Sequence, residues 1–251
     1  MFKTLLFTCF LIYANVLFSF PKPNVHYLKN GATAIVVVDP NSKISSSYVF
    51  VRTGSINEDE FLGSGISHYL EHLLAGGTTS FKSEKEYQKI IDNLGGAYNA
   101  YTSYDHTAYY IHTSSVNIKK ALQTLYEWTV FGDWTSDEFF RENGVIKKEM
   151  ERAHNNVDRK IYQNTQQLFY QKSPYQYPIL GYADIFDTLT DQNLRTYYKK
   201  NYIPKNFVIV VGGDVSENIV IDFIENTFGQ QLNKAPQNGY SGRNQQILSE
   251  S

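Results

Sequence analysis

The sequence predicts one α+β domain in which a mixed, largely antiparallel sheet packs against helices. Segments with strand and helix patterns alternate only loosely, and turns of hairpin length separate some of the strands. Such short turns favour antiparallel pairing, because parallel neighbours need long crossover connections. Hydrophobic residues make up 42% of the 251 positions, which is enough apolar material for a sizeable core.

The first predicted strands lie in residues 24–38. Val25–Leu28 and Ala32–Val38 flank a Lys29-Asn30-Gly31 turn, an arrangement typical of a hairpin. Further strands are predicted at Ser46–Val51, Ala97–Thr102, Thr107–His112 and Phe207–Val211.

Helices are predicted where apolar residues recur every three or four positions. One of them starts at Ser83, and Glu86 three residues later completes a capping box. The longest predicted helix runs from about Asp137 to Leu168, behind a Ser136 cap. The remaining predicted helices are Ser64–Leu74, Ser83–Asn93, Ser115–Trp128, Asp191–Asn201 and Glu217–Thr227.

The composition argues against several classes of protein. Lys and Arg together number 23 against 25 Asp and Glu, which gives a formal net charge of −2, and no long basic run occurs. We therefore expect no nucleic-acid partner. Cys9 is the single cysteine, so an intramolecular disulfide framework is excluded.

The N-terminal segment has the pattern of a secretory signal peptide. Lys3 precedes an apolar run of about 14 residues, which is short for a membrane span, and Pro21 and Pro23 follow it. We therefore expect residues 1–19 to be a signal peptide, and the protein to be secreted or periplasmic. An uncleaved membrane anchor is the alternative. No later segment approaches membrane-spanning length.

A change in composition predicts where the folded domain ends. After Gly229 the residues become rich in Gln, Asn, Ser and Gly. Residues 230–251 are therefore predicted to be a polar linker or tail. The folded domain is expected to span residues 24–229.

The residues with the clearest chemical meaning are His68, Glu71 and His72, in the order H-x-x-E-H. Histidines four apart lie about 40° apart around a helix, so both imidazoles can bind one zinc ion. Glu71 beside them is suited to act as general base on water at the metal. The spacing is that of the inverted zincins. The alternative without metal is a solvated helix face that happens to carry these residues.

A third ligand is predicted on the long helix. Apolar residues gather within about 80° of Glu149 on a helical wheel, among them Phe139, Val145, Ile146 and Ala153. Glu142 lies about 20° from Glu149, whereas Glu151 points to the opposite side. Because a carboxylate on an apolar face needs a partner, Glu149 is a candidate zinc ligand and Glu142 a candidate for orienting a ligand. Pairing of Glu149 with Arg or His is the alternative without metal.

These residues resemble those of the pitrilysin/insulinase peptidases, a family that includes the mitochondrial processing peptidase subunits. The resemblance covers residues 25–227 and extends to a Tyr-x-Pro-x-Asn pattern at residues 202–206. It implies that Glu149 is the third zinc ligand and that Glu142 matches a second family glutamate seven residues earlier. The family usually has phenylalanine where this chain has Ala75.

The resemblance also implies a substrate and a partner. The stretch Gly95–Ser103 is similar to the family's edge strand, to which an extended peptide adds, and Asn99 and Ala100 match the positions nearest the scissile bond. Family members pair two homologous domains, so the expected partners are a peptide substrate and a second homologous domain or subunit. The implied activity is that of a zinc-dependent metalloendopeptidase, with Glu71 as general base and one Zn²⁺ per domain.

Two other functions stay open on the sequence alone. One is a zinc-containing, non-catalytic binding or assembly subunit, or a half-enzyme that works only with a second homologous domain. The other is a purely structural domain without metal, which predicts that elemental analysis finds no zinc.

Overall fold

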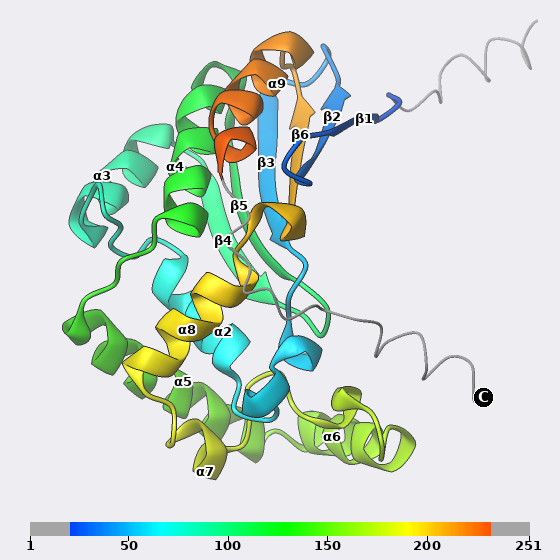
Figure 1. The fold of residues 1–251 in the computed structure, drawn as a ribbon, viewed down its shortest axis with the longest axis vertical. Helices are drawn as coiled ribbons and strands as arrows, with labels where there is room; N and C mark the ends of the chain where they lie inside the picture. The colour runs from blue at the N-terminus through cyan, green and yellow to red at the C-terminus, as the bar shows by residue number, and fades with distance from the viewer. Residues whose placement is uncertain (1–20, 232–251) are drawn as a thin grey trace, which may run out of the picture.

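The computed structural model describes residues 21–231, and these contain a six-stranded mixed sheet with the order β1-β2-β6-β3-β5-β4 (Figure 1). The strands are β1 (Asn24–Tyr27), β2 (Thr33–Val38), β3 (Ile44–Val51), β4 (Ala97–Thr102), β5 (Thr107–Ser114) and β6 (Phe207–Gly213). β2 and β6 pair in parallel, and the other pairs between these strands are antiparallel. The predicted mixed, largely antiparallel sheet is confirmed.

The central strand β3 shows why these residues form a sheet. Its side chains alternate between buried and part-exposed positions, as expected for a strand with one face on the core. Val49 and Val51 are fully buried. β3 is paired on both sides, by β5 and β6, whereas β4 pairs only with β5 among the described strands. One long edge of β4 is therefore unpaired within the described chain.

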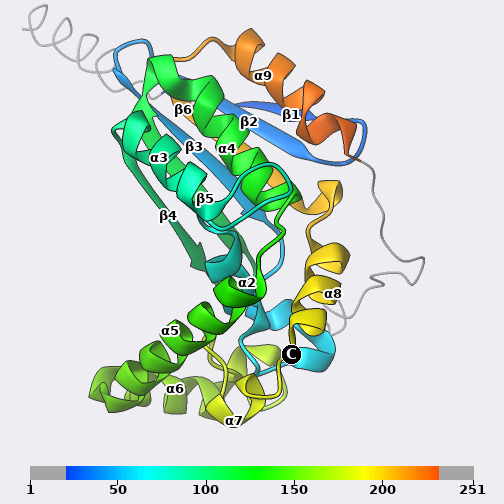
Figure 2. The ribbon, with the colours of Figure 1, turned by 90° about the vertical axis from the view of Figure 1, so that its left-hand side faces the viewer.

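Three helices cover one face of the sheet (Figure 2). They are α3 (Glu84–Leu94), α4 (Ile118–Val130) and α9 (Glu217–Asn226). α4 contacts β3 and β5, and α9 contacts β2. The apolar sides of α4 and α9 meet the buried side chains of these strands and form the core of this layer.

The remaining helices gather at one end of the sheet, below it in Figure 1. They are α2 (Ile66–Leu74), α5 (Ser136–Asn155), α6 (Val157–Phe169), α7 (Ala183–Phe186) and α8 (Asp191–Asn201). α2 lies at the centre of this group and contacts β4, α5 and α8. The Tyr69 hydroxyl donates to the Phe139 carbonyl oxygen over 2.5 Å and so links α2 directly to α5.

The prediction of one long helix over residues 137–168 is wrong. Asn156 has an extended backbone, with φ −92° and ψ 118°, and its side chain accepts the N–H of Arg159 to start α6. Asparagine favours such caps because its short side chain competes with the helical backbone. The first cap is also one residue earlier than predicted, because the Thr135 side chain accepts the N–H of Glu138.

One predicted member of the apolar stripe on α5 is misplaced. Val145 is 38% exposed, whereas Ile146 beside it is fully buried. α5 packs mainly against α2 and α6, and Glu138, Phe139 and Ile146 are its buried residues. The buried face is therefore narrower than the stripe drawn on a helical wheel.

The predicted signal peptide and nearly all of the predicted polar tail lie outside the described residues. Within residues 21–231, no helix combines the length and the apolar character that crossing a bilayer requires.

We expect Thr135→Ala to lower the free energy of unfolding by about 1 kcal/mol, because it removes the acceptor for the Glu138 N–H at the start of α5. Thr135 is exposed, so the loss comes from the cap rather than from packing. Urea denaturation measures the effect. Thr196→Ala, at an exposed position inside α8, is the control and should leave stability nearly unchanged. Equal losses in the two variants would contradict the capping role.

Candidate metal centre

α2 positions His68, Glu71 and His72. One side of this nine-residue helix carries large apolar residues that are buried in the core, namely Tyr69, Leu70, Leu73 and Leu74. Burial of this side fixes the rotation of the helix. The two histidines are consequently held on the side facing α5, with side-chain exposures of only 13% and 17%.

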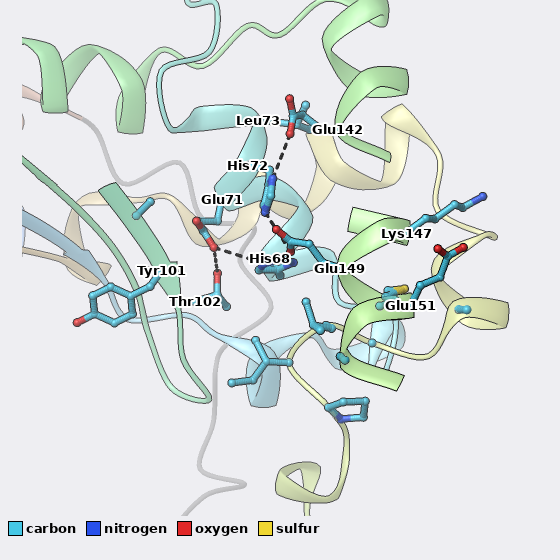
Figure 3. A pocket seen from close by; sticks show the side chains of 18 of the residues that line it. His68, Glu71, His72, Leu73, Tyr101, Thr102, Glu142, Lys147, Glu149 and Glu151 are labelled. Atoms are coloured by element: carbon cyan, nitrogen blue, oxygen red, sulfur yellow. Dashed lines mark hydrogen bonds and ion pairs between the residues drawn. The ribbon is translucent and has the colours of Figure 1, made fainter. Parts of the chain in front are cut away.

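The structure brings the two histidines together with Glu149 from α5 (Figure 3). His68 Nε2 lies 3.6 Å from Glu149 Oε2, and His72 Nε2 lies 3.7 Å from the same oxygen. One ligand atom from each residue lies within 4.8 Å of the others. No other group of three or more such residues converges in this way within residues 21–231. Glu151 points away from the cluster, as the helical wheel predicts.

The three side chains fit a zinc ion. Tetrahedral coordination with bonds of 2.0–2.1 Å places ligand atoms about 3.4 Å apart, close to the separations measured here. Two imidazole nitrogens and one carboxylate oxygen are also the ligand types that zinc takes in hydrolytic sites, where a fourth position stays open. The arrangement suits a catalytic rather than a closed structural site.

Glu142 fixes the orientation of His72. His72 Nδ1 lies 3.1 Å from Glu142 Oε2, and an ionised carboxylate only accepts hydrogen bonds, so Nδ1 is the donor. In the neutral imidazole the Nε2 lone pair then faces Glu149 and His68. Burial opposes ionisation of Glu142, but hydrogen bonds from His72 and Arg141 hold the pKa of its carboxyl group below the ordinary value.

The two histidines differ in their electrostatic surroundings. Burial lowers the pKa of His72, but the hydrogen bond to Glu142 and the charges of Glu71 and Glu149 outweigh it, so the net pKa is raised. His68 has no such compensation. Burial, with a smaller effect from His72, lowers the pKa of His68 to about 3. His68 Nδ1 is also buried without a hydrogen-bond partner in the described structure.

Glu71 lies beside the cluster and is held by a residue from the sheet. The Thr102 hydroxyl, on β4, donates to Glu71 Oε2 over 3.0 Å, and the same oxygen is 3.9 Å from His68 Nε2 (Figure 3). Burial raises the pKa of Glu71 to about 7, although His72 and Thr102 act in the opposite direction. Thr102 has no recognisable role in the sequence, because a contact between residues 31 positions apart leaves no local pattern.

The predicted substrate strand borders the same cleft. The cleft has a volume of about 1300 Å³, and its lining includes the metal cluster, Asn99 and Ala100. Asn99 is exposed and Ala100 is buried, as alternation along β4 requires. The Ala100 N–H donates to the Asn99 side-chain oxygen over 2.9 Å, so a local contact satisfies it.

Two descriptions of known protein families match this chain. The family described as insulinase, peptidase family M16, matches residues 33–182, which is more than half of the chain. The chain belongs to the insulinase family. A second description, the peptidase M16 inactive domain, matches residues 188–249.

Relatives of this insulinase-family chain include a named zinc protease and a mitochondrial-processing peptidase subunit. The zinc protease PqqE of Helicobacter pylori is 32% identical over 211 residues, which cover 83% of this chain and 47% of that protein. The mitochondrial-processing peptidase subunit beta of Blastocladiella emersonii is 28% identical over 218 residues, which cover 87% of this chain and 46% of that protein. The chain thus spans about half the length of these relatives.

A solved structure shares the fold. The crystal structure of a protease from Helicobacter pylori matches with a TM-score of 0.81 and 30% identity, over 87% of this chain and 53% of that chain. The predicted α+β fold and the predicted insulinase-family membership are both confirmed.

In the metal-free protein we expect His72 to bind a proton at higher pH than an ordinary histidine and His68 to stay neutral far into the acid range. Acidification therefore opposes zinc binding through His72 first. NMR titration of the imidazole signals measures both values. Glu142→Gln removes the charge beside His72 and should lower the pKa of His72. Two histidines that titrate together near the ordinary value would contradict this electrostatic description.

Proposed function

We propose that residues 24–229 form the zinc-bearing unit of a metalloendopeptidase that hydrolyses extended peptides. The convergence of His68, His72 and Glu149 beside Glu71 carries the proposal. Membership of the insulinase family and the naming of relatives as zinc proteases support it.

In the proposed mechanism, His68, His72 and Glu149 would hold a zinc ion. The ion would supply Lewis-acid polarisation of the peptide carbonyl and a lowered pKa of water at the site. Glu71 takes the proton from the attacking water and gives it to the leaving amine. The Thr102 hydroxyl donates to Oε2 of Glu71 and so orients the carboxyl group beside the metal ligands.

The proposed substrate is a peptide that adds to the unpaired edge of β4. An extended chain can form backbone hydrogen bonds there, because β4 pairs only with β5 among the described strands. Asn99 and Ala100 border the cleft that contains the metal cluster, so an added strand passes close to the proposed zinc site.

The proposed partner is a second homologous unit, in the same chain or in another subunit. The proposal is based on length, because this chain covers about half the length of each of these relatives. Export is a separate proposal that rests on the pattern of residues 1–19 alone. N-terminal sequencing of the natural protein tests it, and an intact Met1 would contradict cleavage.

We expect the protein to cleave unstructured peptides in a chelator-sensitive manner and Glu71→Gln to reduce the rate by at least about 10²-fold while zinc stays bound. The amide cannot take up the proton, but none of the three ligands changes. Peptide cleavage followed by mass spectrometry, with zinc content measured on the same samples, provides the test. The control is Glu225→Gln on an exposed face of α9, which should cleave like wild type.

Two results would contradict parts of the proposal. Full cleavage by Glu71→Gln with zinc bound would exclude Glu71 as general base. Zinc binding without cleavage by the wild-type chain would favour a zinc-containing subunit that needs a second unit for activity. The observation that favours this second function is that the chain spans only about half the length of its relatives.

We also expect cleavage to depend on the substrate backbone. Methylation of one backbone nitrogen that pairs with β4 removes a hydrogen bond worth about 1 kcal/mol and should lower kcat/KM about fivefold. A series of peptides methylated at successive positions measures the effect. Loss at alternate positions is expected, because every second N–H of a strand faces the same neighbour. Uniform tolerance of methylation would contradict strand addition.

A further inference from the structure

Glu58 is a buried carboxyl group outside the metal cluster. It is 1% exposed and lies between two short turns, Ser55–Asn57 and Asp59–Phe61, that lead into α2. Its interactions in the described chain are with N–H groups and a hydroxyl, and no cation pairs with it there. Burial of an unpaired carboxyl group is costly, so its position calls for a reason.

Glu58 caps the first turn of α2. The helix starts after Gly65, which has φ +73° and no side chain to accept the free N–H groups of the first turn. The Ser64 hydroxyl accepts the Ile66 N–H over 3.2 Å, and Glu58 Oε1 accepts the Ser67 N–H over 3.0 Å. A carboxyl group nine residues upstream thus replaces the usual neighbouring cap.

Ser67 is also held from the other side. Its hydroxyl lies 2.8 Å from the Tyr197 hydroxyl of α8, which in turn lies 3.0 Å from Thr53 Oγ1. The backbone and the side chain of Ser67 are therefore both bound, in the turn directly before His68.

The two histidines are oriented in different ways. The imidazole of His72 is held through Nδ1 by Glu142, but Nδ1 of His68 has no partner in the described structure. No contact at Nδ1 orients the ring of His68 within the described chain, so its direction depends on its backbone and on what packs around it. The backbone at that point belongs to the first turn of α2, and the ends of a helix fray unless they are capped.

We infer that Glu58 is a positioning residue for the metal centre, which fixes the backbone at Ser67 and thereby places the His68 imidazole. The inference rests on the proposed zinc site. Glu142 orients His72 by a hydrogen bond to its ring. Glu58 would orient His68 indirectly, by holding the helix backbone at Ser67. Residues that hydrogen-bond metal ligands directly typically contribute 10–100-fold to metal affinity, and this sets the scale expected for Glu58.

The test compares zinc affinity, measured by competition with a chromophoric chelator, in wild type, Glu58→Ala, Glu58→Gln and Glu127→Ala. We expect Glu58→Ala to bind zinc at least about tenfold more weakly. Glu58→Gln keeps an acceptor for the Ser67 N–H and should stay within about threefold of wild type. Glu127, another buried glutamate, bonds Lys82 and Tyr87 away from the cluster, so its loss should leave zinc affinity unchanged.

Hydrogen exchange on the metal-free proteins gives a second measurement that is independent of zinc. Glu58→Ala should accelerate exchange in the first turn of α2, and Glu58→Gln should restore its protection. Wild-type zinc affinity in Glu58→Ala would overturn the inference, and so would an equal loss in Glu58→Ala and Glu127→Ala. A wild-type protein that binds no zinc would instead overturn the proposed function, and the exchange data would still decide whether Glu58 anchors α2.

Discussion

The site depends on one constraint, which is that α2 must bury one side and present chemistry on the other within nine residues. A helix of this length is not stable alone in water, so its position comes from the elements that surround it. β4, α5 and α8 all contact it. Those same contacts bring Glu149 and Thr102 to the histidines and Glu71, so the packing of the helix and the geometry of the site depend on the same neighbours.

The burial that holds α2 also sets the electrostatics of the cluster. A charged group loses hydration when it is buried, and each residue responds according to its partners. Glu142, with His72 and Arg141 beside it, stays ionised, whereas Glu71 has the pKa of its carboxyl group raised to about 7. In the metal-free protein, two neighbouring carboxyl groups thus differ in pKa because their partners differ.

The sequence predicted what depends on local spacing. The interval between His68 and His72 places both on one helix face, and a helical wheel relates Glu149 to Glu142 correctly. The wheel did not reveal the break at Asn156, because apolar periodicity continues through the cap. The contacts of Thr102 and Glu58 join different elements, so only the folded chain reveals them. The strand order likewise follows from long-range pairing that periodicity does not encode.

The open edge of β4 has a consequence for selectivity. An edge of this kind offers hydrogen bonds to any extended backbone, whatever its side chains. In a folded protein these backbone groups are already paired within its own helices and sheets. The proposed peptidase would therefore distinguish its substrates first by conformation and only then by sequence. Unfolded or flexible segments would be cut, and neighbouring folded domains of the same polypeptide would be spared.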